Sequence, residues 1–330
     1  MSVKRKRNLW KKQTTVVVVL ALILLVACGQ NNTSNGDGRK ETIRIGYQKS
    51  GPILLLKSEK KLEDELGKLG YKVEWSEFNT GASILEALNA GSIDFATAGD
   101  TPSVFAASKG MDLKYIAGGP ASPSSEGILI KNDSNIKSIK DLKGKRVAYN
   151  KASISQYFLN EALEDAGLSM EDVESVYLNP PDASLAFEQG EVDAWVIWDP
   201  YLASSESKGN KVLQNSAGIV ENRTLFMASS SVIKNDKEVV HKVVEELAAA
   251  GQEINEDPTE AASLLSEATN LPEEIWINVL KRKKSDVNYI DQTMINELQR
   301  QADGLQKAKL TEKRAKIQQF VWQPDKKTVD

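Results

Sequence analysis

The chain has 330 residues and a formal net charge of −4; six of its 42 basic residues lie in the first 27 positions, which leaves 36 basic and 46 acidic residues, a formal −10, for the rest. This acidic balance argues against nucleic acid as a partner. One cysteine and one histidine exclude an intrachain disulfide and leave no side chains for a zinc set or a Cys/His dyad.

The first 27 residues have the pattern of a secretory signal peptide. Met1 to Lys12 is basic and contains no acidic residue, and Val16 to Val26 is a short apolar run. Crossing a bilayer takes about 20 apolar residues, so this run is too short for an ordinary membrane helix. It ends in Leu-Val-Ala-Cys28, which resembles the bacterial lipobox. We therefore expect Cys28 to be lipidated; the alternative is a plain secretory signal in which the cysteine is incidental.

After Cys28, the segment up to residue 40 is rich in Gly, Asn and Ser and predicts a flexible tether. The chain would then be held at the outer side of the cell membrane through its lipid anchor. The folded body is expected to begin near Glu41. About 290 residues exceed one ordinary hydrophobic core, which predicts two lobes.

Strands and helices alternate along the body, and this alternation predicts an α/β fold with mainly parallel sheets. The first half contains predicted strands over 42–47, 72–78 and 93–98 and helices over 53–69, 83–90 and 102–108. The second half contains predicted strands over 146–149, 173–178 and 193–198 and helices over 155–166 and 183–188.

The two halves match each other at an offset of about 100 residues. Tyr47-Gln-Lys corresponds to Tyr149-Asn-Lys, and Gly91-Ser-Ile-Asp corresponds to Gly190-Glu-Val-Asp. A repeat of this length predicts two similar lobes rather than a solenoid. Chance similarity between α/β units is the alternative.

The remainder of the chain predicts one more strand, over 224–229, and then helices over 238–255, 258–268, 272–283 and 291–307. Helices without strands would cover a lobe that is already built. The chain would cross between lobes near 127–131 and near 224–231, and two such crossings form a hinge. The expected division is lobe I, 41–130 with 228–330, and lobe II, 131–227.

Ligands of open parallel sheets lie beyond the carboxyl ends of the strands. Each helix N-terminus there offers free N–H groups and about half a positive charge, so several that converge on one cleft would hold a small anion without an ion pair. The alternative is that these residues only cap helices. The residues at the predicted strand ends are Gln48-Lys-Ser, Asn79-Thr-Gly81, Gly99-Asp100-Thr101, Lys151-Ala-Ser153, Pro180-Pro-Asp182 and Asp199-Pro-Tyr201.

Few other side chains are candidates for a site. Trp195 and Trp198 face opposite sides of one strand, and we expect Trp195 in the core and Trp198 at the cleft. Arg223 is a basic candidate near the second crossing. His241 lies in a charged helical segment and is expected at the surface. The sequence predicts no catalytic residue, no metal site and no cofactor.

Six segments carry a resemblance to a known family: 45–49 (IGYQK), 86–94 (EALNAGSID), 99–102 (GDTP), 141–148 (DLKGKRVA), 192–201 (VDAWVIWDPY) and 321–324 (VWQP). From Thr42 to Pro324 the chain resembles the aliphatic-sulfonate-binding proteins of ABC importers. These belong to a larger group with taurine-, nitrate- and thiamine-precursor-binding proteins.

The resemblance implies a type II periplasmic-binding-protein fold that closes over its ligand, in a monomer that delivers aliphatic sulfonates to an ABC permease for sulfur acquisition. Where the family usually has Lys-Gly-Ser-Ser, this chain has Lys-Ala-Ser-Ile at 151–154, which puts the ligand's size and head-group contacts in question. Together, matching motifs and strand ends predict these ligand-binding residues: Gln48, Gly81, Gly99, Asp100, Thr101, Ser153, Ile154, Ser155, Trp198 and Asp199.

A sulfonate suits such a site because it is ionised at any growth pH and spreads its charge over three oxygens. Asp100 and Asp199 would repel it unless they accept backbone N–H groups. Rival ligands are taurine, nitrate and a thiamine-pyrimidine precursor. A rival of another class is a pyrimidine-forming enzyme, but Lys49 and Lys151 have no neighbour in the sequence pattern that would shift their pKa.

Overall fold

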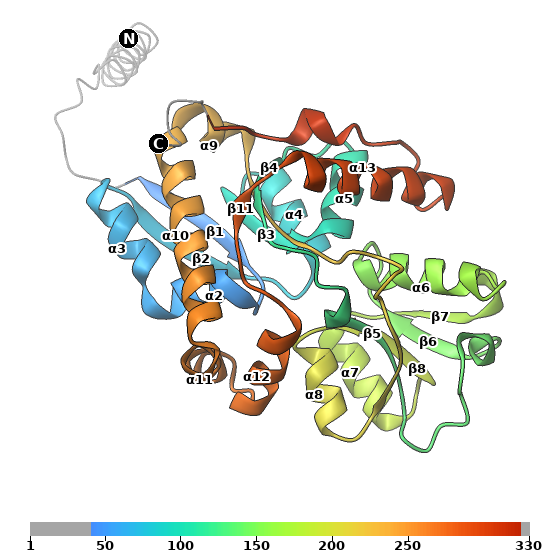
Figure 1. Ribbon diagram of the computed structural model, residues 1–330. Helices are drawn as coiled ribbons and strands as arrows, with labels where there is room; N and C mark the ends of the chain where they lie inside the picture. The colour runs from blue at the N-terminus through green and yellow to red at the C-terminus, as the bar shows by residue number, and fades with distance from the viewer. Residues whose placement is uncertain (1–40, 325–330) are drawn as a thin grey trace, which may run out of the picture. The chain divides into compact units, whose positions relative to one another are not determined.

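The computed structural model describes residues 41–324 (Figure 1). The predicted signal peptide, the lipidation of Cys28 and the tether lie outside these residues. Across residues 41–324, none of the helices combines the length and the apolar character needed to cross a bilayer.

The first sheet contains six strands in the order β11-β4-β10-β3-β1-β2. These are β1 (Thr42–Tyr47), β2 (Lys72–Glu77), β3 (Phe95–Gly99), β4 (Lys114–Gly118), β10 (Thr224–Ala228) and β11 (Asn288–Tyr289). Strand β1 is parallel to β2 and β3, whereas β10 is antiparallel to β3 and β4.

The second sheet contains five strands in the order β7-β6-β8-β5-β9. These are β5 (Glu126–Ile130), β6 (Arg146–Tyr149), β7 (Glu174–Tyr177), β8 (Ala194–Trp198) and β9 (Lys211–Asn215). Strand β6 is parallel to β7 and β8, whereas β5 is antiparallel to β8 and β9.

The α/β fold with two similar sheets is confirmed. Most strands of each sheet point the same way, while β10 and β11 in the first sheet and β5 in the second run in the opposite direction. The three strands of each sheet that pair in parallel are those predicted from the strand–helix repeat. The antiparallel neighbours arise because β5 and β10 each enter a sheet directly from the other one. Without a crossover helix to reverse the chain, such a strand arrives in the opposite direction.

The chain passes between the sheets over 119–125 and 216–223. The expected crossings near 127–131 and 224–231 were therefore wrong by several residues, because β5 already pairs within the second sheet and β10 within the first. We propose that lobes I and II divide at these two segments.

Hydrogen bonds join the two crossing segments to each other. The Ser122 N–H donates to the carbonyl oxygens of Glu221 and Asn222, both at 3.0 Å. The Asn222 side-chain amide donates to Ser125 Oγ at 3.2 Å. These bonds tie the two crossing segments together.

Twelve helices accompany the strands in the described part of the chain, with short 3-10 turns at Pro123–Ser125, Ile139–Leu142, Met170–Asp172 and Ile317–Phe320. They are α2 (Gly51–Glu59), α3 (Lys61–Lys68), α4 (Gly81–Asn89), α5 (Asp100–Ser108), α6 (Ile154–Asp165), α7 (Pro180–Gln189), α8 (Tyr201–Ser207), α9 (Ser230–Asn235), α10 (Lys237–Glu256), α11 (Pro258–Thr269), α12 (Glu273–Arg282) and α13 (Gln292–Lys307). The helix predicted over 53–69 is two helices, broken at Lys60 with φ 58°.

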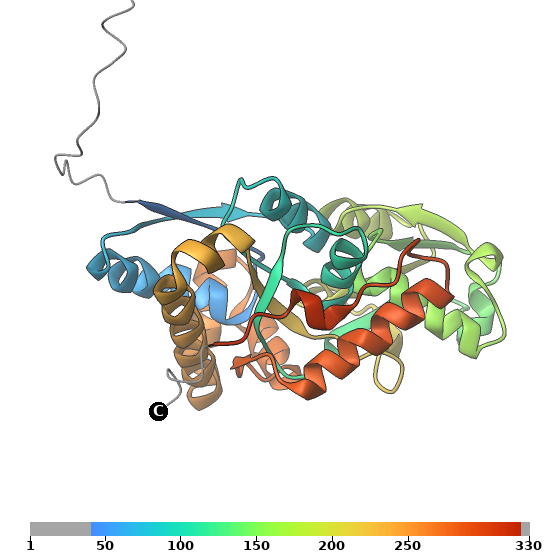
Figure 2. The same ribbon diagram turned by 90° about the horizontal axis from the view of Figure 1, so that it is seen from above.

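The C-terminal helices cover the first sheet's side of the molecule, as predicted. Helix α10 packs on α2 and α3, and α13 packs on α5 (Figures 1 and 2). The apolar stripe of α10 is buried at Val239, Val240, Val243 and Leu247, with the spacing of one helix face. Helix α12 in addition contacts α8, which follows a strand of the second sheet.

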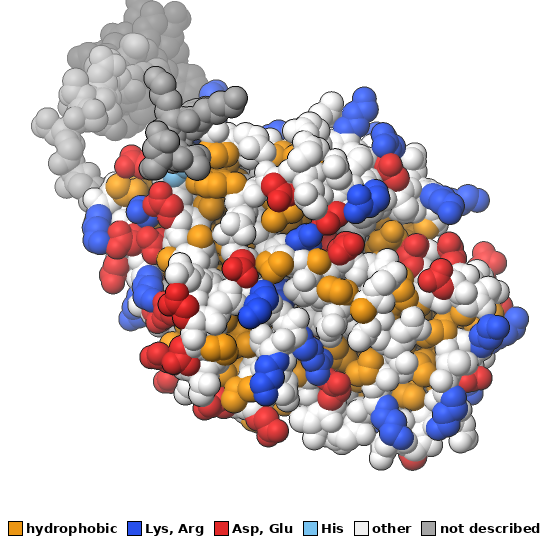
Figure 3. Space-filling model, viewed as in Figure 1, with side chains coloured by type: hydrophobic (Ala, Val, Ile, Leu, Met, Phe, Trp, Pro, Cys, Tyr) orange, Lys and Arg blue, Asp and Glu red, His pale blue; other side chains and the backbone are white. Residues whose placement is uncertain are grey.

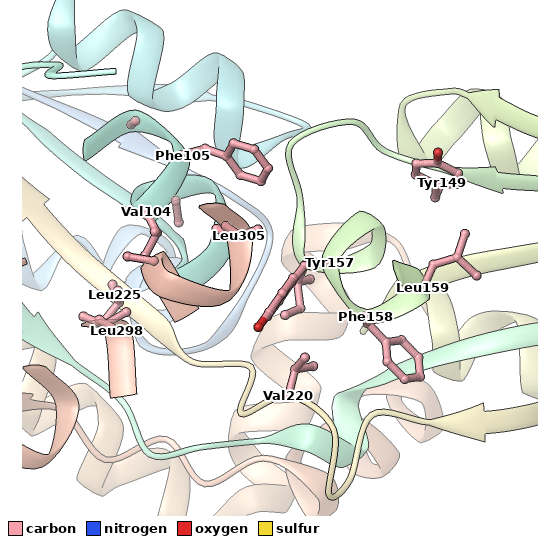
Figure 4. Packing of buried hydrophobic residues seen from close by; sticks show 14 of the residues in the cluster. Val104, Phe105, Tyr149, Tyr157, Phe158, Leu159, Val220, Leu225, Leu298 and Leu305 are labelled. Carbon is pink, nitrogen blue, oxygen red and sulfur yellow. The ribbon is translucent and has the colours of Figure 1, made fainter. Parts of the chain in front are cut away.

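One hydrophobic cluster contains residues that accompany both sheets (Figure 4). Tyr157 of α6 extends toward α13, and an added Cβ at Gly304 would lie 2.5 Å from its hydroxyl. Phe158, the next residue, is fully buried on the side of the second sheet. The helices of the two sheets thus share apolar contacts.

A buried carboxyl group stands at the end of the first crossing. Glu126, the first residue of β5, is completely buried and accepts a hydrogen bond from Ser155 Oγ at 2.7 Å. Its Oε2 atom has no hydrogen-bond partner among the described residues. Burial raises the pKa of Glu126 well above its ordinary range, against the lowering effect of Ser155, and the charges of Asp199 and Asp100 raise it further.

We predict that Glu126→Gln becomes more stable than the wild type as pH rises. A raised pKa in the folded state stabilises the protein fully below the ordinary pKa of 4.5 and loses that contribution as pH rises toward the folded pKa. Glutamine has no titratable proton, so the melting-temperature advantage over wild type should grow between pH 4.5 and 8, by about 2–4 °C per kcal/mol.

The exposed Glu174→Gln is the matched control and should show no such trend. A constant difference between Glu126→Gln and wild type from pH 4.5 to 8, measured by thermal melts, would contradict a neutral Glu126.

Candidate functional site

A cavity of about 390 Å³ lies where strand ends of both sheets meet. Its lining includes Gln48 after β1, Gly99 at the end of β3, and Trp198 at the end of β8. Asn222 and Arg223, from the second crossing, complete the wall between the sheets. The cavity therefore lies beyond the carboxyl ends of the parallel strands, as predicted.

Five helices begin at this cavity. Residues at the starts of α2, α4, α5, α6 and α8 belong to its lining. The cap residues Ser50 and Ser153 make no side-chain capping bond, so the first-turn N–H groups of α2 and α6 are not engaged by their caps. Five of the six predicted strand ends are thus brought together; the sixth, Pro180 to Asp182, does not line the cavity.

The starts of α4 and α5 are held side by side by a glycine. A Cβ at Gly81 would lie 2.5 Å from Cγ of Pro102, closer than side-chain carbons approach. Pro102 is in the first turn of α5, where its missing N–H costs nothing. This contact aims two helix N-termini at the same space.

Seven of the ten predicted ligand-binding residues line the cavity: Gln48, Gly81, Gly99, Ser153, Ile154, Trp198 and Asp199. The other three, Asp100, Thr101 and Ser155, are buried behind the lining and bond to protein groups. Contact of any of the ten with a ligand stays a prediction.

Asp100 organises the loop at the start of α5. Its N–H donates to the Arg223 carbonyl at 3.0 Å, and its Oδ2 accepts the Arg223 N–H at 3.0 Å. Its Oδ1 accepts the Thr101 N–H at 2.6 Å. Burial raises the pKa of Asp100, and these N–H groups act against that rise. The expectation that this carboxylate accepts backbone N–H groups is confirmed.

Asp199 lines the cavity and connects it to α12. Its Oδ1 accepts the Ala203 N–H at 3.0 Å and lies 3.5 Å from Nη1 of Arg282. Arg282 also pairs with Glu206 of α8. Burial raises the pKa of Asp199 to about 6, opposed by the positive charge of Arg282.

The tryptophans lie on the predicted sides of β8. Trp195 is fully buried, with its ring centroid 5.9 Å from that of Phe187. Trp198 lines the cavity, and Trp276 and Leu280 of α12 add apolar wall. An organic tail could therefore be accommodated beside the polar helix starts.

Lys283 is a cavity residue that the sequence interpretation missed. It follows α12 directly, and its Nζ lies 2.5 Å from Oγ1 of Thr224. Burial lowers the pKa of Lys283, whereas Asp199 and Asp100 raise it. The sequence signal was present as the basic run 281–284, but such a run at a helix end is also a common way to complement the helix dipole.

Two other basic residues of the lining, Arg223 and Lys49, are paired with acids, whereas Lys284 is exposed to solvent. Arg223 Nε lies 2.6 Å from Oε2 of Glu297, and its Nη1 donates to the Gly119 carbonyl at 2.9 Å. Lys49 lies 3.3 Å from Glu77. Figure 3 shows acidic and basic side chains interspersed over one face of the molecule.

His241 lies outside the cavity and is half-buried rather than exposed, which corrects the expected surface position. Its Nδ1 is 3.0 Å from the Tyr289 hydroxyl, and its ring centroid is 5.1 Å from that of Trp322. These aromatic neighbours are distant in the sequence, so the helical segment that contains His241 could not predict its burial. Within the described range 41–324, no cluster of His, Cys, Asp and Glu is placed to hold a metal ion.

Comparisons with known proteins agree with this architecture. The NMT1/THI5-like family model matches residues 68–261. A protein of Escherichia coli (strain K12), provisionally named an aliphatic sulfonates-binding protein, is 34% identical over 287 residues, 86% of this chain and 89% of that protein.

Two solved structures are similar over 86% of this chain. The alkanesulfonate-binding protein SsuA from Xanthomonas axonopodis pv. citri bound to MOPS has a TM-score of 0.81 and 33% identity, with 98% of that chain covered. The periplasmic aliphatic sulphonate binding protein SsuA from Escherichia coli has a TM-score of 0.77 and 34% identity, with 93% covered. The chain therefore belongs to the NMT1/THI5-like family, in its group of aliphatic sulfonate-binding proteins.

Proposed function

We propose that this chain is an extracytoplasmic solute-binding protein that captures aliphatic sulfonates in the cavity and delivers them to an ABC permease for sulfur acquisition. The observation that carries the proposal is the convergence of five helix N-termini, from both sheets, on one cavity. The identity of 33–34% to proteins named for sulfonate binding supports the same ligand class.

The chemistry of a sulfonate suits this convergence. Its three oxygens share one charge and accept hydrogen bonds, and each helix N-terminus offers backbone donors together with a favourable dipole. One terminus contributes about 0.3–1 kcal/mol to an exposed anion, and more in a partly buried site. The first turns of α2 and α6, whose N–H groups are not engaged by their caps, supply donors, and the other termini add their dipoles.

The apolar part of the wall suits the organic part of such a ligand. Ile154 and Trp198 lie at the second sheet's side, and Trp276 and Leu280 belong to α12. Burial of each methylene stabilises a complex by about 0.8 kcal/mol. A ligand with a charged end and an alkyl tail can therefore use both kinds of wall.

Delivery to a permease would use the hinge. The two crossings connect the sheets in only two places, and their mutual hydrogen bonds let both bend together. We propose that a monomer closes over the ligand by this bending and presents both lobes to the permease.

We also propose that the chain is not an enzyme. The relatives of 33–34% identity are named for sulfonate binding, and His241, the one histidine of the sequence, lies outside the cavity. Taurine, nitrate and a thiamine-pyrimidine precursor remain the rival ligands. They differ from an alkanesulfonate in charge, size or tail, so one titration panel separates them.

Calorimetry of the purified chain with n-alkanesulfonates, taurine, nitrate and a thiamine-pyrimidine precursor tests the ligand class. We expect alkanesulfonates to bind with an affinity that rises about 4-fold per methylene until the apolar wall is covered. The alcohol of the same length, which lacks the charge, is the control. Nitrate binding more tightly than ethanesulfonate would contradict the proposed ligand.

Two substitutions separate ligand contact from structural support. Gln48 is half-buried in the lining, so Gln48→Ala should weaken sulfonate binding about 3- to 10-fold and leave the melting temperature near that of the wild type. Asp199→Ala should lower both, because it also removes the bond to Ala203 and leaves Arg282 with one acid fewer. Unchanged affinity in Gln48→Ala would remove it from the site.

The proposed anchor is tested by Cys28→Ser, at a position outside the described residues. Lipidation needs the thiol, so the variant should appear in the soluble fraction after cell disruption while the wild type sediments with membranes. A variant that stays with the membranes would show that another part of the chain holds it there.

A further inference from the structure

Lys283 is one of two basic residues of the lining that have no ion pair within residues 41–324; the other, Lys284, is exposed to solvent, whereas Lys283 is half-buried. The Lys283 Nζ donates to the neutral Thr224 hydroxyl, and no carboxylate of the described residues lies within ion-pair distance of it. Arg223 and Lys49, by contrast, each have an acidic partner. A cation that is partly removed from water without a counter-charge is unfavourable in the empty cavity.

The backbone fixes the place of this ammonium group. Thr224 pairs with Gly99 across β10 and β3, and Gly99 is the cap residue of α5. The Lys283 Nζ therefore lies beside a helix N-terminus, where two sources of positive potential act on the same space.

The segment that carries Lys283 is held against α10. An added Cβ at Gly251 would lie 2.0 Å from the Ser285 carbonyl oxygen, so only glycine allows this approach. The Ser285 N–H donates to Oδ1 of Asn255 at 3.0 Å. The backbone next to Lys283 is thus held in place by packing, and the Thr224 hydroxyl holds the ammonium group.

The charged groups near Lys283 contact other partners or are exposed to solvent. From α5, Asp100 accepts the N–H groups of Thr101 and Arg223. From the start of α8, Asp199 lies near Arg282. The side chains of Arg223 and Arg282 are both in ion pairs, and Asp286, further along Lys283's own segment, is exposed to solvent.

We propose that Lys283 is a ligand-binding residue: it is the charge partner of the ligand's anionic head group and makes the cavity select anions over neutral molecules. This inference rests on the proposed function of the cavity as an anion site. The positive potential in the cavity then comes from helix dipoles together with one full positive charge.

The test compares Lys283→Met, Lys283→Arg and wild type by calorimetry with butanesulfonate at pH 7. Removal of a hydrogen bond to a charged group should weaken binding about 10- to 100-fold in Lys283→Met, and Lys283→Arg should keep most of the affinity. The matched control is Lys281→Met, which removes the same charge from an exposed position outside the lining and should change the affinity less than about 2-fold.

The pH profile distinguishes a charge partner from a packing residue. An anion stabilises the protonated ammonium, so affinity is full below the pKa of Lys283 in the free protein and falls as pH rises through it. That pKa is lowered from the ordinary 10.5 by burial. Lys283→Arg should move the fall to higher pH, and Lys283→Met should show a flat, weak profile.

The possible outcomes separate the two proposals. If wild type binds sulfonates and Lys283→Met binds them with the same affinity, the role of Lys283 is overturned and the proposed function stays intact. If wild type prefers another anion of the panel, the proposed ligand fails, and the same comparison with that anion decides the role of Lys283. If Lys283→Met does not fold, Lys283→Arg with an unshifted pH profile overturns the role.

Discussion

Removal of an anion from water is the constraint on which this architecture depends. A protein with excess acidic residues cannot attract such a ligand through its overall charge, so the positive potential must be built at one place. Parallel strands followed by helices provide it, because every such unit directs a helix N-terminus toward the same edge of its sheet. Because two sheets face one cavity, their helix N-termini converge there, whereas those of a single sheet would point into open solvent.

The same constraint applies to the carboxyl groups near the cavity, because a free negative charge there would repel an anion. Asp100 is bound by backbone N–H groups, and Asp199 is close to Arg282. Glu126 has a strongly raised pKa and one oxygen without a partner among residues 41–324, which fits a neutral acid. These three carboxyl groups are therefore bonded, paired or uncharged, and the repulsion expected between them and an anion is reduced.

The sequence predicted the parts of the structure that depend on neighbouring residues. Strand–helix alternation and the position of Trp198 follow from local periodicity and spacing. Strands β5 and β10 could not be placed from such patterns, because their direction depends on entry from the other sheet. Lys283 and Glu126 were missed for the same reason: their significance comes from Thr224 and Ser155, which are distant in the sequence.

The loop before α6 shows how a departure from the family pattern can be reconciled with this site. Ala152 adopts φ 54°, a left-handed conformation that costs an alanine about 1 kcal/mol relative to glycine. Its N–H donates to Oε1 of Gln156 at 2.7 Å, which helps to hold that conformation. Ile154 gives the start of α6 an apolar side chain that has no hydrogen-bond donor. A site with an apolar side chain at this position has greater need of a full positive charge, and the ammonium of Lys283 in the same lining meets that need.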